Sequence, residues 1–322
     1  MVTSNNFTLT HFLKLVRWPN LLMLFIVQYA LRYLYILSRL EAAEMTIAVS
    51  HFHFFLITLS TILIAAGGYI INNIEDIASD SINKKENRIV GIYIHEKTAN
   101  NLYTLVTFLG VMIGFLLTMF YDIRLIGFIN VFTAGLLYFY SNTYKCIALL
   151  GNLVISILTC MALLLLLIIE PAALTNSEIK LFIAGFAIFA AAFTFIREII
   201  KDIEDMKGDS VVGCKTLPIM IGSNPTKWII VALSVILLCL LLFAQYNWYE
   251  TVNYQSQGNL KNEFYLVFSY TILFITIPVG YFIYLLIKAD EKPSFTNCSK
   301  IAKSIMAAGI FSILVFYCSQ FI

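Results

Sequence analysis

The sequence predicts an all-α, polytopic membrane protein with nine transmembrane helices. Hydrophobic residues make up 60% of the 322 residues and charged residues only 12%, whereas soluble proteins contain about 45–50% apolar and about 25% charged residues. Long apolar runs recur along the chain, and no soluble core would be large enough to bury them. The net charge of +2 provides no basic field of the kind that nucleic-acid binding requires.

Nine apolar stretches have the length of a membrane span, since the hydrocarbon core of a bilayer takes about 20 residues of helix. They run roughly over 19–38, 52–74, 99–120, 124–141, 147–169, 179–200, 227–247, 264–287 and 300–320. The fourth is the shortest of them. No linker or low-complexity segment divides the chain, so residues 1–322 are expected to form a single membrane domain.

The distribution of Lys and Arg predicts the orientation of these spans. Sixteen of the 21 lie in the N-terminal segment and in the loops after the second, fourth, sixth and eighth spans, including Lys84 and Lys85. Arg32 lies inside the first span, and the other loops hold only Arg39, Arg124, Lys180 and Lys261. Because cytoplasmic loops are enriched in positive side chains, the N-terminus is expected in the cytoplasm and the C-terminus outside.

The six cysteines are expected to be small core residues, because most of them lie in or beside apolar runs. They show neither a CxxC pair nor metal-ligand spacing with histidine. They are Cys146, Cys160, Cys214, Cys239, Cys298 and Cys318.

An acidic segment, NNIEDIASD, closes the second span at residues 72–80. Asn72, Asp76 and Asp80 are each four residues apart, so a continuing helix would place them on one face. Oxygen-bearing side chains in such a row repel each other unless a cation lies among them. Magnesium prefers oxygen ligands and commonly links carboxylates to a phosphate. The spacing therefore favours a magnesium site.

A second acidic segment, DIEDMKGD, closes the sixth span at residues 202–209. Asp202, Asp205 and Asp209 again share one helical face, and Glu198 extends that face by one turn. Gly208 is expected to end or loosen the helix. Either segment alone could be a solvated loop in which acidic residues alternate with Lys. Two helix-periodic segments at equivalent helix ends favour a functional site instead.

Together the two segments suit a diphosphate held by a magnesium cluster. Breaking an allylic C–O bond places negative charge on the departing diphosphate, and cations directed at that charge lower the barrier. The remaining carbocation needs a dry pocket in which aromatic rings can stabilise it until a nucleophile captures it. No general base can be assigned from the sequence.

The two segments and the nine spans resemble the UbiA superfamily of intramembrane prenyltransferases, whose motifs are NDxxDxxxD and DxxDxxxD. The resemblance covers the whole chain. Three further stretches resemble family segments: Arg17-Trp18-Pro19-Asn20, Tyr140-Ser141 with Lys145 and Gly151-Asn152, and Lys215-Thr216-Leu217-Pro218. The resemblance implies a central cavity with magnesium and diphosphate at its cytoplasmic end and the prenyl tail between the helices. It also implies a bacterial inner membrane.

The resemblance implies an enzyme, a magnesium-dependent prenyltransferase acting from an allylic diphosphate on a lipophilic acceptor. Residues 83–90 differ from the R-T-x-x-R-P of the aromatic-acceptor branch and resemble the N-K-P-E-R-V-V of bacterial relatives of the lipid branch. That branch transfers geranylgeranyl to a glycerol-phosphate lipid in ether-lipid synthesis. An aromatic acceptor, as in quinone biosynthesis, is the alternative.

The resemblance also implies roles for individual residues. The expected magnesium ligands are Asn72, Asp76, Asp80, Asp202, Asp205 and Asp209. The expected substrate-binding residues are Arg17, Asn20, Asn72, Asn73, Arg88, Tyr140, Lys145 and Lys201. The basic residues among them also fit a purely topological role. Asn73 replaces the usual Asp of the family, which removes one negative charge.

Three other interpretations of the sequence were weighed. A CDP-alcohol phosphotransferase needs a DGxxAR motif, which the chain lacks. A cation-coupled transporter needs charges near the bilayer midplane in broken helices, but here the acidic residues gather at helix ends. An inactive relative that kept the fold is the third, and Asn73 is the feature that suggests it.

Overall fold

The computed structural model describes residues 7–83, 88–121, 123, 125–256 and 262–321. These residues form helices and two isolated bridges, with no strand among them. The all-α prediction is confirmed. Lys84, Lys85, Arg124 and Lys261, which entered the orientation argument, lie outside the described residues.

Eight helices in the described ranges are long and apolar enough to cross a membrane. Two are composite: α2 (Trp18–Tyr29) continues through η1 (Ala30–Ile36) into α3 (Leu37–Ala42), and α13 (Asn262–Thr271) continues through η4 (Ile272–Thr276) into α14 (Ile277–Lys288). The others are α4 (His51–Glu75), α6 (Glu96–Tyr121), α8 (Leu150–Ile169), α10 (Ser177–Val211), α12 (Ser223–Gln255) and α15 (Lys292–Ser319).

The predicted fourth span corresponds to α7 (Ile126–Asn142), which has 17 residues. At about 1.5 Å per residue it is shorter than a typical membrane span. The structure therefore confirms a polytopic membrane protein but does not confirm the exact count of nine spans. The remaining helices are short: α1 (Leu9–Leu15), α5 (Ile77–Asn83), η3 (Tyr144–Cys146), α9 (Pro171–Thr175) and α11 (Leu217–Ile221).

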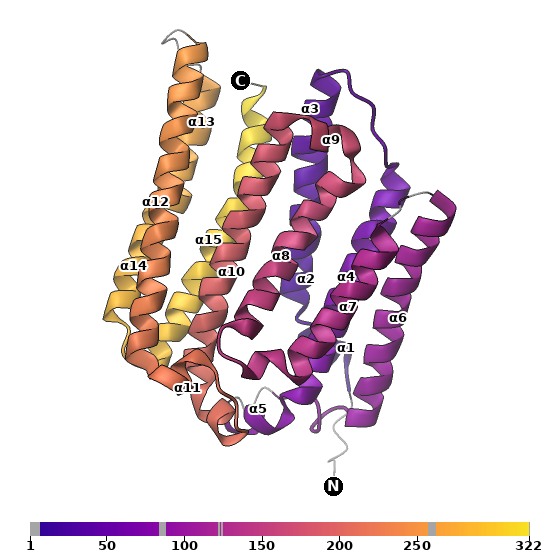
Figure 1. Ribbon diagram of the computed structural model, residues 1–322, viewed down its shortest axis with the longest axis vertical. Helices are drawn as coiled ribbons and strands as arrows, with labels where there is room; N and C mark the ends of the chain where they lie inside the picture. Colours follow the sequence, from indigo (N-terminus) through magenta and orange to yellow (C-terminus); the bar gives the residue numbers. More distant parts are fainter. Residues whose placement is uncertain (1–6, 84–87, 122, 124, 257–261, 322) are drawn as a thin grey trace.

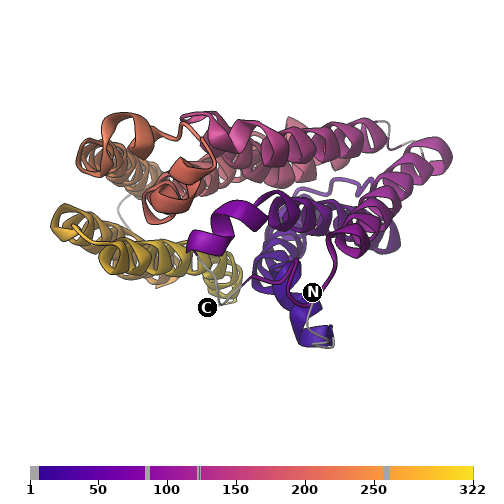
Figure 2. The same cartoon turned by 90° about the horizontal axis from the view of Figure 1, so that it is seen from below.

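The long helices run side by side along the long axis of the molecule (Figure 1). The short helices α1, α5 and α11 lie at one end of the bundle, the lower end in that view. The opposite end carries α3, α9 and the last turns of α15. Seen from below, α5 leaves the end of α4 and reaches across the bundle toward α10 (Figure 2). The end that holds α5 is called the acidic end below, because both acidic segments lie there.

A buried ion pair ties the helices at the opposite end. Arg32 Nη1 lies 2.6 Å from Glu170 Oε1, and neither side chain is exposed. Arg32 also packs against the ring of Phe54 at 4.5 Å, and Glu170 accepts a hydrogen bond from the backbone of Ala48 at 2.8 Å. The charge inside the first predicted span is therefore neutralised in a contact between helices, because an unpaired charge at this depth would be costly.

Candidate active site

A cavity of about 300 Å³ lies between α2, α4, α7, α8, α10 and α15. Its wall changes character along the helices. Toward the acidic end the lining is polar, and farther in it is formed by apolar residues such as Leu24, Leu163, Phe186 and Ile310. The polar lining consists of Arg17, Asn20, Tyr69, Asn72, Tyr140, Arg197, Glu198, Lys201 and Lys303. This shape suits a ligand with an anionic head and a long apolar tail.

The first acidic segment does not form the continuous helix that its spacing predicts. Helix α4 ends at Glu75 and α5 begins at Ile77, so the chain bends at Asp76. Backbone hydrogen bonds still link Asp76 to Asn72 and Asp80 to Asp76, at 2.9 and 2.8 Å. The single face for Asn72, Asp76 and Asp80 is predicted for one continuous helix, and that condition is not met, because the helix is interrupted at Asp76 and α5 packs on α10.

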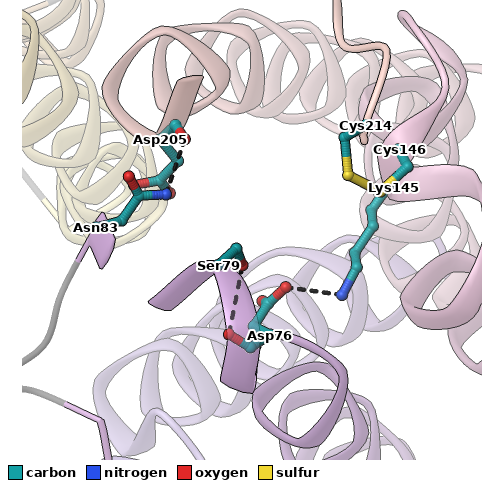
Figure 3. The surroundings of a disulfide bond; sticks show 7 residues. All are labelled: Asp76, Ser79, Asn83, Lys145, Cys146, Asp205 and Cys214. Carbon is teal, nitrogen blue, oxygen red and sulfur yellow. Dashed lines mark hydrogen bonds and ion pairs between the residues drawn. A yellow bond between two sulfur atoms is a disulfide. The ribbon is translucent and has the colours of Figure 1, made fainter. Parts of the chain in front are cut away.

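Asp76 lies between an amide and an ammonium group. Asn72 Nδ2 donates a hydrogen bond to Asp76 Oδ2 at 2.6 Å, and Lys145 Nζ lies 2.7 Å from Asp76 Oδ1. Figure 3 shows the Lys145 side chain extending toward Asp76 from the opposite side of the acidic end. Both side chains of this ion pair are about one-fifth exposed. The structure therefore joins two predicted site residues from segments far apart in the sequence.

The second acidic segment is helical throughout, as its spacing predicts. Helix α10 runs without a break to Val211, so Asp202, Asp205 and Asp209 share one face. Asp202 Oδ2 accepts a hydrogen bond from Asn152 Nδ2 on α8 at 2.8 Å. The Asp202 carboxylate is therefore oriented from a neighbouring helix.

Gly208 joins the two segments instead of ending the helix, so the prediction for this residue is wrong. A Cβ at Gly208 would lie 2.6 Å from the Ser79 carbonyl oxygen, and the missing side chain therefore lets α5 touch α10. Asn83 of α5 donates to the Asp205 carbonyl at 2.8 Å (Figure 3). It also accepts a hydrogen bond from the Gly208 amide at 2.9 Å.

Arg17 stands at the junction of α1 and α2 in a left-handed conformation, with φ of 50°. Such a conformation costs an L-residue about 1–2 kcal/mol and needs support from its surroundings. Its guanidinium lies over the ring of Tyr69, 5.2 Å from the centroid. Burial by itself lowers the pKa of Arg17, but Tyr69, Glu198 and Asp76 raise the pKa above its ordinary value. Arg17 therefore remains a cation at the polar end of the cavity.

Two hydrogen-bonded groups complete the polar wall. Glu198 pairs with Arg197 at 3.1 Å and with Lys201 on the same helix. On the other side, Lys303 Nζ donates to Asn20 Oδ1 at 3.3 Å, and Asn20 Nδ2 donates to the Tyr69 hydroxyl at 3.2 Å.

Tyr69, Arg197 and Lys303 line the cavity, although no sequence motif assigns them to the site. Arg197 and Lys303 were counted only as signals of membrane orientation. The position of Lys303 inside the last predicted span was the signal that could have singled it out.

Three predicted substrate-binding residues do not line the cavity: Lys145, which pairs with Asp76, and Asn73 and Arg88. Asn73 donates to the carbonyls of Tyr69 and Leu15, at 2.7 and 3.3 Å, and so fastens α1 to α4. Arg88 donates to the carbonyl of Ile77 at 3.5 Å. The structure gives both residues contacts to backbone, whereas Arg17, Asn20, Asn72, Tyr140 and Lys201 do line the cavity.

The expectation that the cysteines are small core residues is wrong for Cys239 and Cys318, which are exposed, and for two cysteines that form a disulfide. Cys146 and Cys214 form a disulfide beside Lys145 (Figure 3), and the Lys215 amide donates to the Cys146 carbonyl at 2.8 Å. The bond joins the loop before α8 to the loop after α10. The two cysteines are 68 residues apart in sequence, so only the packing of the helices brings them together.

The donor atoms at the acidic end fit magnesium in kind. Asn72 Oδ1 is buried and has no hydrogen-bond partner in the described part of the chain, while the carboxylate of Asp76 lies beside the same amide. Amide and carboxylate oxygens are the ligands that Mg²⁺ prefers. Among the described residues, however, no three His, Cys, Asp or Glu side chains are grouped closely enough to hold a metal ion.

Comparison with known proteins identifies the family. Residues 41–255 match the UbiA prenyltransferase family. The chain belongs to the UbiA prenyltransferase family. This UbiA family member is 30% identical over 75% of its length to a digeranylgeranylglyceryl phosphate synthase of Methanosphaera stadtmanae. It is 32% identical to the enzyme of that name from Methanobrevibacter smithii and 36% identical to the one from Methanosarcina mazei.

These matches differ in the length that they cover. The matched segment spans 65% of the Methanobrevibacter protein and 57% of the Methanosarcina protein, which is less than two thirds of either. It spans 80% of the Methanosphaera protein. All three relatives come from archaea.

Solved structures show the same fold along nearly the entire chain. A structure described as a digeranylgeranylglyceryl phosphate synthase covers 96% of this UbiA family member with a TM-score of 0.60 at 22% identity. A UbiA homolog from Archaeoglobus fulgidus, bound to GPP and Mg²⁺, covers 94% with a TM-score of 0.58 at 16% identity. The protein is therefore an integral membrane protein with the UbiA fold.

Proposed function

We propose that this UbiA family member transfers a prenyl group from an allylic diphosphate to a hydroxyl group of a glyceryl phosphate lipid. The observation that carries the proposal is the cavity, whose polar end has a surplus of cationic side chains and adjoins two acidic segments. A long apolar wall continues from that polar end into the bundle, as a prenyl tail requires. Relatives named digeranylgeranylglyceryl phosphate synthase support the choice of acceptor.

In this proposal the two acidic segments hold Mg²⁺. The ligands would come from Asn72, Asp76, Asp80, Asp202, Asp205 and Asp209. Mg²⁺, when bound, supplies positive charge to the departing diphosphate. The contact between α5 and α10 at Gly208 supports this assignment, because it keeps the two segments side by side.

Basic side chains around the acidic end would bind the diphosphate directly. Lys201 lines the cavity, and Lys145 reaches Asp76 at its edge. Arg17 offers a planar fork of donors, whereas each lysine acts as a point charge. Arg88 would need to give up its contact with Ile77 to take part. The enrichment of Lys and Arg in the loops at this end predicts that it faces the cytoplasm.

The rest of the cavity would protect the reacting carbon. Tyr140 lines the cavity, where its ring would stabilise a carbocation. Apolar side chains beyond it exclude water, which would otherwise capture the cation. Residues 1–322 would act as one membrane domain. The bacterial inner membrane stays a prediction, and the relatives named above are archaeal.

The test is a transfer assay with protein purified in detergent. Radiolabelled geranylgeranyl diphosphate and Mg²⁺ are supplied with geranylgeranylglyceryl phosphate, 1,4-dihydroxy-2-naphthoate or 4-hydroxybenzoate. We expect transfer to the glyceryl phosphate, abolished by EDTA and reduced at least about 100-fold in Asp76→Ala and Asp205→Ala. Transfer only to an aromatic acid would show that the acceptor is that acid and not a glyceryl phosphate. Neither transfer nor diphosphate release from folded protein would favour an inactive relative or a transporter.

A further inference from the structure

The polar end of the cavity holds basic side chains beyond those that the proposed function assigns to the diphosphate. Four cationic side chains line it, Arg17, Arg197, Lys201 and Lys303, and Glu198 is the carboxylate that faces them within the described lining. Glu198 is shared between Arg197 and Lys201. Within the described residues Arg17 and Lys303 form no direct ion pair with a carboxylate; they contact Tyr69 and Asn20 respectively, and the charge of Glu198 acts on both of them without such a contact.

These cations are close enough to repel one another. The positive charges of Arg197 and Arg17 act on Lys303, as does the negative charge of Glu198, although the three cations come from α10, the α1–α2 junction and α15. Arg197 Nε is buried and makes no hydrogen bond to any described residue. Like charges that face each other in a confined cavity are unfavourable unless an anion lies between them. The arrangement thus has donors and charge available for an anion.

This cationic group lies deeper in the bundle than the acidic segments. On α4, Tyr69, whose hydroxyl contacts Asn20, precedes Asp76 by seven residues, which is about 10 Å along a helix. On α10, Arg197 precedes Asp202 and Asp205 by one to two turns. A single diphosphate bound by metal at Asp76 and Asp205 does not extend over that distance. A second anionic group would therefore occupy the deeper position.

We infer that Lys303, with Asn20 and Arg197, binds the phosphate monoester of the acceptor lipid. This inference rests on the proposed function, in which the acceptor is a glyceryl phosphate. In such an acceptor the phosphate and a free hydroxyl are borne by the same three-carbon glycerol unit. The allylic carbon would lie deeper in the bundle than the diphosphate that it carries. Holding the acceptor phosphate beside Lys303 would place the free hydroxyl next to that carbon. Lys303 acts as a binding and positioning residue in this account.

The experiment measures binding and transfer with two acceptors that differ only in the phosphate, geranylgeranylglyceryl phosphate and geranylgeranylglycerol. Binding of each to detergent-purified protein is measured in EDTA without prenyl diphosphate, so that no metal-bound site contributes. We expect the wild type to bind the phosphorylated lipid at least about 10-fold more tightly. Lys303→Met should remove that preference, and Lys303→Arg should keep most of it.

Two controls separate this site from a general effect of charge or folding. Lys300→Met removes a positive charge one turn earlier on α15, from an exposed position that does not line the cavity, and should leave both affinities unchanged. The KM for geranylgeranyl diphosphate should also stay within about twofold in Lys303→Met, because that ligand binds at the acidic segments.

Each result of this experiment either supports or overturns the inference. Equal binding of the two lipids by the wild type, or a preference that persists in Lys303→Met, overturns the inference. The inference is also overturned if Lys303→Met changes the KM for geranylgeranyl diphosphate more than it changes the affinity for the acceptor lipid. Lys303 would then belong to the binding site of the prenyl donor. A phosphate preference that depends on Lys303 without any transfer to the lipid supports the phosphate site and contradicts the proposed reaction.

Discussion

Lys145 Nζ lies 2.7 Å from Asp76 Oδ1, so the carboxylate expected to ligate magnesium is paired with an ammonium group from the loop before α8. The pair is partly exposed, and such pairs stabilise a fold by only about 0–1 kcal/mol. The ion pair matters instead because Lys145 and a metal ion compete for the Asp76 carboxylate, and a metal ion that binds Asp76 must displace Lys145. The freed ammonium group is then available to a phosphate oxygen.

Lys145→Met should therefore change two binding constants in opposite directions. We expect a lower Mg²⁺ concentration for half-maximal transfer, because nothing competes for Asp76, and a KM for the prenyl diphosphate raised about 10-fold. Mg²⁺ and diphosphate titrations of the transfer rate measure both. Lys207→Met removes an exposed charge from α10 and serves as the control. An unchanged Mg²⁺ requirement would show that Lys145 does not compete with the metal.

Asn73→Asp restores the residue that is usual in the family, yet it should not raise activity. The Asn73 amide donates to the carbonyls of Tyr69 and Leu15, and a carboxylate has no hydrogen to donate. We expect the free energy of unfolding to fall by about 1–3 kcal/mol, measured as a lower Tm in detergent.

The control for this variant is Asn142→Asp, which removes a similar amide-to-carbonyl bond to Tyr138 at an exposed helix end. It should have little effect on Tm. A faster transfer rate in Asn73→Asp would instead place this position among the metal ligands.

Gly208→Ala should separate the two acidic segments. The added Cβ would lie 2.6 Å from the Ser79 carbonyl oxygen, which is backbone and can move only if α5 moves. We expect at least about a 10-fold loss of transfer activity, because misplaced ligands weaken transition-state stabilisation. Gly185→Ala, on the same helix with open space around the Cβ, should be neutral or slightly stabilising. Full activity in Gly208→Ala would contradict the role of this contact.

Glu170→Gln should affect stability rather than chemistry. It leaves the Arg32 charge buried without its carboxylate, which costs about 3–5 kcal/mol, and the pair lies at the end opposite the site. We expect a clearly lower Tm and a transfer rate near that of the wild type at temperatures where the variant stays folded. The control is Glu178→Gln, whose partner Arg39 and whose own side chain are partly exposed. An unchanged Tm would contradict this assignment.

The sequence by itself determined the class of the protein, most of the spans and the two acidic segments. These features are local, because a run of about 20 apolar residues selects the membrane and the spacing of Asp202, Asp205 and Asp209 selects a helical face. The motif pair also pointed to the UbiA family, to which the chain belongs.

Only the tertiary structure decided how these segments meet. The bend at Asp76, the contact of α5 with Gly208 and the Cys146–Cys214 disulfide depend on residues far apart in the chain. Lys303 enters the cavity for the same reason, since α15 packs against α10 and α2. Sequence spacing reports the geometry within one helix, whereas contacts between helices depend on how side chains of several helices fill the space between them.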